Sequence, residues 1–227
     1  GLQNAATFGG SSFILNALNQ SDFRAVSDFD IRHLVNANAV WDVPLGRGRQ
    51  FFSGMNKFAD AILGGWQMVG VFRYNSGLPF SLSGVGGWPT NWNRYSYVVR
   101  LNDVETKSTP NGVFNGPNNF ADARAAYRSF RSPGPGESGD RNQLRFPSYI
   151  VLDMGIEKSF AMPWKEGHKL SIRAEAFNVT NTQRFTGFNT ANLSTDPEKG
   201  SAPTNWGNFT NIQGSPRVMQ FAIRYDF

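Results

Sequence analysis

Apolar and polar residues alternate with a period of two along five stretches of the chain. Each stretch is more than ten residues long, whereas strands of soluble proteins usually span about 5–6 residues. A tilted strand of about 9–11 residues can cross a bilayer, and the alternation gives it one apolar and one polar face. The pattern predicts five long strands, at about 32–43, 66–80, 148–160, 168–178 and 217–227.

The same alternation assigns the side chains of these strands to two opposite faces. The apolar positions predicted to contact lipid include Val35, Ala37, Leu152, Met154, Leu170, Ile172, Phe221 and Ile223. The polar positions predicted to line a lumen include Asn36, Asp153, Glu157, Arg173, Glu175 and Arg224. The charged residues among them are interpreted as cross-strand ion pairs that hold the wall. A lumenal path for protons or ions is the alternative.

The connections between the predicted strands differ in length. Segment 161–167 is a short turn, and segment 44–65 contains a helix-like stretch at about 55–63. The other two connections, 81–147 and 180–215, are long and rich in Gly, Asn and Ser. Outer-membrane barrels have short periplasmic turns and longer extracellular loops, and a structureless loop as long as 81–147 argues against a compact soluble domain. The chain is therefore predicted to be all-β, with antiparallel transmembrane β-barrel strands and long extracellular loops.

Five is an odd number of strands, whereas bacterial single-chain barrels have an even number, at least eight. We therefore expect the chain not to close on itself. The strand that begins near Arg32 should have an open edge or pair with a segment outside these residues.

Large aromatic residues gather at the short-turn ends of the predicted strands. They are Trp41, Trp66, Phe160, Trp164, Tyr225 and Phe227. Amphipathic rings prefer the headgroup layer of a membrane, so this pattern predicts one aromatic girdle. The alternative is that large residues cap the core of a soluble barrel.

The last strand carries apolar residues at every second position up to the final residue. These positions are Met219, Phe221, Ile223, Tyr225 and Phe227. The pattern resembles the terminal signal by which outer-membrane barrels are handed to the barrel-assembly machinery. We interpret these five residues as an assembly signal on a structural strand.

Composition narrows the class of protein further. Charged residues make up 17% of the chain, below the roughly 25% of an ordinary soluble domain. Cysteine is absent, which excludes disulfides and thiolate metal sites. The net charge is +5, but the basic residues are scattered rather than clustered, which argues against nucleic acid as a partner.

Catalytic chemistry has little support in the sequence. The two histidines, His33 and His168, lie at strand edges without the spacing of metal ligands. We therefore expect no enzyme activity, no metal and no cofactor. In the long loop, Trp88, Trp92, Tyr95 and Tyr97 are the candidate ligand-binding residues, because aromatic rings can stack on a sugar or another planar ligand. Packing of these rings within the loop is the alternative.

Six short stretches, in colinear order from about residue 28 onward, resemble the last strands of TonB-dependent receptors, most closely the Oar-like group with a carboxypeptidase-regulatory-like N-terminal domain. They are Asp30–Asn36, Leu63–Gln67, Ser76–Phe80, Gly139–Asn142, Asp153–Lys158 and Arg173–Val179. The resemblance implies a 22-stranded barrel with a plug in its lumen. Residues 1–227 would then be the C-terminal segment of one barrel domain, without the plug and the earlier strands.

The resemblance also implies a function, uptake of an unidentified ligand across the cell outer membrane. The implied partners are outer-membrane lipid, the rest of the barrel and its plug, the TonB energising complex and the barrel-assembly machinery. A structural or adhesive surface protein, which displays loops or self-assembles, is the rival. A soluble β-sandwich binding module is a third class, and the strand length and the terminal pattern disfavour it.

Overall fold

The computed structural model describes residue 16 and residues 18–88, 94–110, 112, 114–164, 166–189 and 201–227. The chain divides into two compact units. The sheet unit comprises His33–Asn75, Tyr149–Gln183 and Gly214–Phe227, and the loop unit comprises Gly1–Arg32, Ser76–Ser148 and Arg184–Gln213. Among the described residues, no helix is long and apolar enough to span a membrane.

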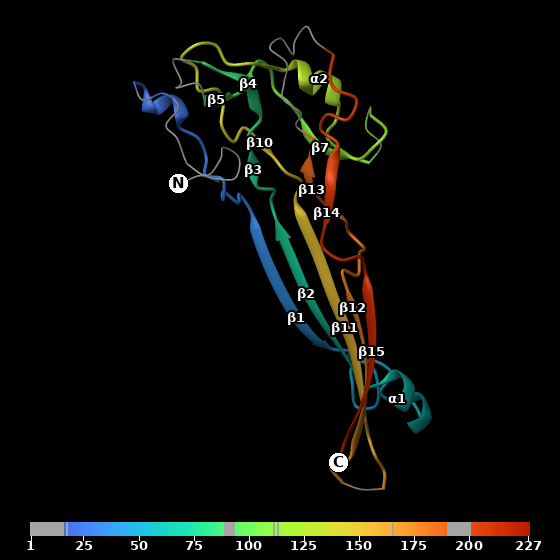
Figure 1. Cartoon of the computed structure of the whole chain (residues 1–227). Helices are drawn as coiled ribbons and strands as arrows, with labels where there is room; N and C mark the ends of the chain where they lie inside the picture. The colour runs from blue at the N-terminus through green and yellow to red at the C-terminus, as the bar shows by residue number, and fades with distance from the viewer. Residues whose placement is uncertain are drawn as a thin grey trace. The chain divides into compact units, whose positions relative to one another are not determined.

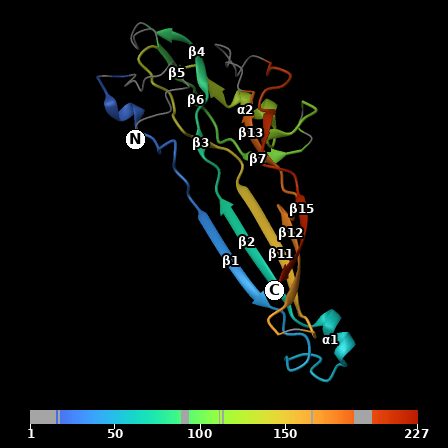
Figure 2. The ribbon, with the colours of Figure 1, turned by 60° about the horizontal axis from the view of Figure 1, so that its bottom comes forward.

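The sheet unit contains one five-stranded antiparallel sheet in the order β1-β2-β11-β12-β15. Its strands are long and lie side by side in both views (Figure 1, Figure 2). Their bounds are β1 (Leu34–Asp42), β2 (Trp66–Asn75), β11 (Tyr149–Ala161), β12 (Lys169–Phe177) and β15 (Val218–Asp226). All five predicted strands are confirmed, with neighbours in chain order as in a β-meander.

The second strand is shorter than predicted. The alternation continues to Phe80 in the sequence, but β2 ends at Asn75, and residues 79–80 form a separate strand, β3 (Pro79–Phe80). Pro79 has no N–H to donate to a ladder. A Cβ on Gly77 would lie 1.6 Å from the carbonyl oxygen of Phe146. The chain therefore leaves the sheet at this point to approach another backbone segment.

The strand register places the predicted apolar residues on one continuous face. Val35 pairs with Tyr74, Leu152 with Phe72, and Ile172 with Ile223. We name this side the apolar face. It comprises Val35, Ala37, Ala39, Trp41, Trp66, Met68, Gly70, Phe72, Tyr74, Ile150, Leu152, Met154, Ile156, Lys158, Phe160, Leu170, Ile172, Ala174, Ala176, Met219, Phe221, Ile223 and Tyr225. The residues between them form the polar face, which includes Asn36, Asp153, Glu157, Arg173, Glu175 and Arg224.

No described buried apolar side chain belongs to the sheet unit, since the hydrophobic core residues all lie in the loop unit. Phe221 and Ile223 on the apolar face are 74% and 75% exposed. Among the described strands, β1 pairs only with β2, and β15 pairs only with β12. The predicted open edge is therefore confirmed. Among the described residues, no hydrophobic core covers the apolar face of the sheet.

The connection between β1 and β2 contains α1 (Lys57–Leu63), within the stretch that the sequence indicates as helix-like. The side chain of Asn56 caps the helix by accepting a hydrogen bond from Ala59 N at 2.8 Å. The helix ends at Gly64, whose N–H donates to Asp60 O. Figure 1 shows α1 at the end of the sheet where the chain also terminates.

The loop unit has its own secondary structure, so the expectation of a structureless long loop is wrong. Its strands pair in two-stranded antiparallel sheets: β3 with β10 (Leu144–Arg145), β4 (Ser83–Trp88) with β5 (Arg94–Tyr97), β6 (Val99–Arg100) with β9 (Phe130–Arg131), β7 (Thr106–Thr109) with β8 (Asn118–Phe120), and β13 (Arg184–Phe188) with β14 (Phe209–Gln213). It also contains η2 (Gln20–Phe23) and α2 (Ala123–Arg128).

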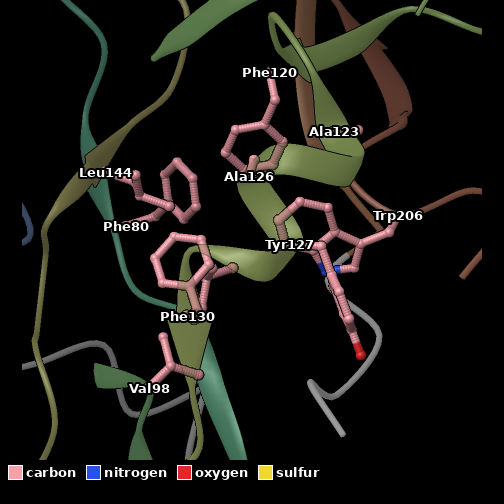
Figure 3. Packing of buried hydrophobic residues seen from close by; sticks show 10 residues of the cluster. Phe80, Val98, Phe120, Ala123, Ala126, Tyr127, Phe130, Leu144 and Trp206 are labelled. Atoms are coloured by element: carbon pink, nitrogen blue, oxygen red, sulfur yellow. The ribbon is translucent and has the colours of Figure 1, made fainter. Parts of the chain in front are cut away.

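A hydrophobic core joins the two long loops within this unit. Trp206, which is fully buried, stacks on Phe120 with ring centroids 4.7 Å apart and meets the edge of Tyr127 at 5.3 Å. Figure 3 shows these rings together with Phe80 and Phe130. The sequence patterns did not predict this core, because its residues come from segments 80–144 and 206, which are far apart along the chain.

Candidate functional site

Three of the four candidate ligand-binding aromatics lie on one β-hairpin of the loop unit. Trp88 ends β4, and Tyr95 and Tyr97 lie in β5, while Trp92 lies outside the described residues. In the register, Trp88 pairs with Arg94, and Tyr97 pairs with Ser83. The backbone therefore brings three of the four residues into one hairpin. That they bind a ligand stays a prediction.

Tyr97 is held inside the loop unit and is only 6% exposed. Its backbone N–H donates to Ser138 O at 3.0 Å. Burial raises the pKa of its phenol to about 12, opposed by the charge of Arg141 and assisted by that of Asp28. The phenol therefore stays protonated at all physiological pH values.

The stretch Gly139–Asn142, one of the motifs that resemble TonB-dependent receptors, is a structural junction. A Cβ on Gly139, which has a φ of +72°, would lie 1.9 Å from Tyr97 O, so glycine is required here. Asp140 accepts a hydrogen bond from Arg100 N at 2.7 Å. Asn142 N donates to Ser81 Oγ at 2.8 Å. This stretch thus connects several strands of the long loop.

The same junction ties the segment that precedes β1 to the long loop. Arg141 forms an ion pair with Asp28 at 3.4 Å, and Asn142 Nδ2 donates to Val26 O at 2.9 Å. Arg145 pairs with the carboxylate of Asp30. These contacts span more than 110 positions along the chain. No short sequence motif could have indicated them.

Another ion pair of the loop unit joins Arg131 and Glu137. The two terminal guanidinium nitrogens of Arg131 donate hydrogen bonds to the Glu137 carboxylate, at 2.6 and 2.9 Å, and Gly134 N donates to the same carboxylate at 2.7 Å. The hydrogen bond from Arg131 is the largest cause that lowers the pKa of Glu137 to about 2. The carboxylate is therefore ionised throughout the physiological range.

The loop unit also contains an open hollow of about 170 Å³ beside α2. Its acidic lining residues are Asp103, Glu105 and Asp122, and the last of these caps α2 by accepting from Arg124 N and Ala125 N. Within the described ranges, no group of three or more His, Cys, Asp or Glu side chains is arranged to hold a metal ion.

The charged residues of the polar face pair differently from the prediction. Arg173 pairs with Glu175, and Arg224 Nε contacts Asp226 at 2.6 Å, so both ion pairs run along a strand rather than across strands. The cross-strand partner of Glu175 is Gln220, which donates a hydrogen bond to it. Asp153 instead accepts from the backbone N–H of Asn178 at 2.8 Å. The polar face is thus a network of local hydrogen bonds.

The proposed assembly signal forms the outer edge of the sheet. Met219, Phe221, Ile223 and Tyr225 alternate along β15 on the apolar face, and Phe227, at 95% exposed, follows the strand. His168 Nδ1 lies 2.7 Å from the Tyr225 hydroxyl, a contact that fits a structural role for this histidine. The predicted girdle residues lie at one end of the sheet, where Trp66 pairs with Lys158 and Phe160 with Leu170.

The family profile described as "Outer membrane beta barrel domain" matches residues 1–220. The chain belongs to this family. Neither a curated protein nor a solved structure matches the chain. As an outer membrane β-barrel domain, the chain resides in the outer membrane. The exposed apolar face of the sheet is therefore the surface that meets lipid, and the polar face is directed toward the barrel interior.

Proposed function

We propose that this barrel domain is the C-terminal portion of a TonB-dependent outer-membrane transporter that takes up a ligand without enzymatic chemistry. The observation that carries the proposal is the open five-stranded sheet, whose two edges must pair with further strands in a membrane. Unpaired backbone groups in hydrocarbon cost several kcal/mol each. Additional strands of a larger barrel would satisfy both edges.

The polar face of the sheet supports a plug in the lumen. Val40 pairs with Val69, and Val71 follows two positions along β2 on the same face. Val40 is 67% exposed. A water-filled pore does not favour clustered valines, because exposed apolar surface is unfavourable in water. A folded plug inside the barrel would cover them.

The loop unit supports capture of a ligand at the cell surface. All its segments connect to the sheet at the end opposite the short turn, which is the extracellular end of an outer-membrane barrel. Loops held by their own core can keep a binding surface in place. In the proposed mechanism, the loops capture the ligand, and the TonB energising complex then moves the plug.

The rival function is a structural or adhesive surface protein that displays the same loops. The sequence of the complete gene is the first way to distinguish the transporter from the surface protein, because a transporter requires an upstream plug domain and a TonB box. The direct test is binding of the purified complete protein to the purified periplasmic domain of TonB. Binding that is lost when the TonB box is deleted supports transport. Absence of a plug and of TonB binding supports the rival.

A photo-crosslinking experiment tests the plug separately. We place p-benzoylphenylalanine at Val40 on the polar face or at Val35 on the apolar face of the complete protein. Val40 should cross-link to an upstream segment of the same polypeptide, whereas Val35 should not. Equal labelling from both positions would contradict a plug in contact with this face.

A further inference from the structure

The connection between β1 and β2 is much longer than a hairpin needs. Two residues can join antiparallel strands, whereas residues 43–65 separate Asp42 from its partner strand and include α1. The connection lies at the end of the sheet that also carries the short turn between Ala161 and Lys169. In an outer-membrane barrel this is the periplasmic end. A helix is therefore not needed at this position to connect the two strands.

Two residues of the apolar face hold the C-terminal end of α1. Trp66 and Lys158 are partners in the register on that face. The Trp66 indole N–H donates to Ile62 O at 2.9 Å, and the Lys158 ammonium donates to Gly64 O. The helix is thereby anchored on the lipid-facing side of the sheet rather than on its lumenal side.

Lys158 is the one charged residue in the described apolar face, and its contacts explain how it is tolerated. It is only 4% exposed. Its ammonium lies 5.3 Å from the Trp66 ring centroid and 5.1 Å from that of Phe160. A cation near a helix C-terminus also interacts favourably with the helix dipole. The Lys158 ammonium therefore attaches α1 to the sheet. The aliphatic part of a lysine side chain can lie along apolar surface while its charged end is bound elsewhere.

The exposed side of α1 and of the preceding loop is apolar. Phe58 and Ile62, which share one stripe of the helix, are 77% and 53% exposed. Leu63, Phe51 and Phe52 add exposures of 50%, 51% and 70%. Large exposed apolar patches mark binding surfaces for protein, ligand or membrane.

The charge of this connection is basic. Arg47, Arg49 and Lys57 outnumber one acidic residue, Asp60, whose carboxylate accepts the Arg47 N–H at 2.7 Å. A short helix that combines exposed aromatic and aliphatic residues with basic residues is suited to lie in a membrane interface that contains anionic lipid.

We propose that α1 and the Phe51–Phe52 pair form an interfacial phospholipid-binding element, seated in the headgroup layer of the periplasmic leaflet. This element is continuous with the lipid-facing surface, since Trp66 and Lys158 attach the helix to the apolar face of the sheet. Phe58 and Ile62 then reach about 5–10 Å into the boundary of headgroups and acyl chains. The basic residues remain among the phosphates.

The first test uses the complete protein without substitution. The protein is reconstituted in vesicles of phosphatidylethanolamine and phosphatidylglycerol that contain a photoactivatable phosphatidylglycerol, with a diazirine near the headgroup. Cross-linked residues are assigned by mass spectrometry. The proposal expects cross-links within residues 51–63. Cross-links confined to the sheet strands, with none in 51–63, would overturn it.

The second test measures depth, and the chain has no cysteine to interfere. Nitroxide labels are placed by Phe58→Cys or Ile62→Cys, with Lys57→Cys as the control on another side of the same helix. The ratio of oxygen to nickel-chelate accessibility should be several-fold higher at 58 and 62 than at 57. Equal aqueous accessibility at all three positions overturns the proposal. Shielding of 58 and 62 from both reagents also overturns it, because this indicates a protein cover.

Discussion

At the scale of single residues, neighbouring side chains on a strand meet different surroundings. Phe221 and Gln220 are adjacent in β15, yet Phe221 pairs with Ala174 on the apolar face, and Gln220 pairs with Glu175 on the polar face. Ser171 and Ile172 are likewise adjacent in β12 and lie on opposite faces, but Ser171 does not offer an open site for an arginine. Ser171 is 7% exposed, and its hydroxyl oxygen lies 2.9 Å from that of Ser159. An arginine would not fit there, so Ser171 cannot serve as the polar-face control for an arginine substitution on the apolar face.

Arginine scanning at the middle of β15 tests the two faces. Phe221→Arg should lower the stability of the assembled barrel by about 2–4 kcal/mol, because it places a charge in lipid. Gln220→Arg should have a much smaller effect, since the new guanidinium faces the barrel interior beside Glu175. A refolding titration in bilayers measures both. Equal losses would mean that the two faces are assigned incorrectly.

A second residue-scale prediction concerns pH. The pKa of Glu137 is about 2 when folded, against an ordinary value of 4.5. Its ion pair therefore stabilises the loop unit fully above about pH 4.5, and this contribution is lost as the pH falls through about 2. Hydrogen exchange at the Gly134 amide should be faster in Glu137→Gln than in the wild type above pH 4.5, and the difference should vanish near pH 2. A pH-independent difference would contradict this.

At the scale of elements, the two units obtain their stability from different sources. The loop unit buries its own aromatic core, in which Trp206 contacts Phe120 and Tyr127. The strands of the sheet unit contribute no residue to the described hydrophobic core, so they depend on hydrogen bonding between strands and on lipid at the apolar face. Damage to the loop core should therefore leave the sheet intact.

The Trp206→Ala variant tests this independence. Loss of a large buried ring should destabilise the loop unit by about 3–5 kcal/mol. Protease digestion of intact cells should then cleave the loops faster, while the barrel remains in the membrane at normal abundance. Phe29→Ala is the control, because Phe29 belongs to the same unit but is 73% exposed. Loss of membrane-inserted protein in Trp206→Ala alone would show that the two units depend on each other.

At the scale of the whole molecule, the open sheet determines what the chain requires. Among the described strands, β1 and β15 each have one unpaired edge, and no hydrophobic core covers either face of the sheet in the described residues. In the outer membrane, lipid covers one face and further strands must complete the ladder. The terminal strand, β15, carries the apolar and aromatic pattern that we interpret as an assembly signal.

Phe227→Asp tests the terminal signal. If Phe227 is read by the barrel-assembly machinery, this substitution should lower the abundance of the complete protein in the outer membrane several-fold. Ligand affinity per assembled molecule should be unchanged. Asp226→Asn is the control, because Asp226 lies on the opposite face of β15. Unchanged abundance with reduced affinity would place Phe227 in a binding site instead.

The sequence by itself determined the strands and the two faces of the sheet. A period of two is a local property of the chain, so it fixes which side chains share a face before any strand pairs. The predicted bounds of β1, β11, β12 and β15 therefore agree with the structure within two residues. The exception is β2, which stops at Asn75 although the alternation continues, because Gly77 must approach Phe146.

Only the tertiary structure decided the loop unit and the position of α1. Asn118 donates to Trp206 O across 88 positions, and Asn142 reaches Val26 across 116. Such contacts join residues without periodicity, so no local pattern encodes them. In the same way, alternation placed Lys158 on the apolar face, but only the fold shows that its charge meets the carbonyl at the end of α1. Local patterns follow backbone geometry, whereas these contacts depend on how distant segments pack together.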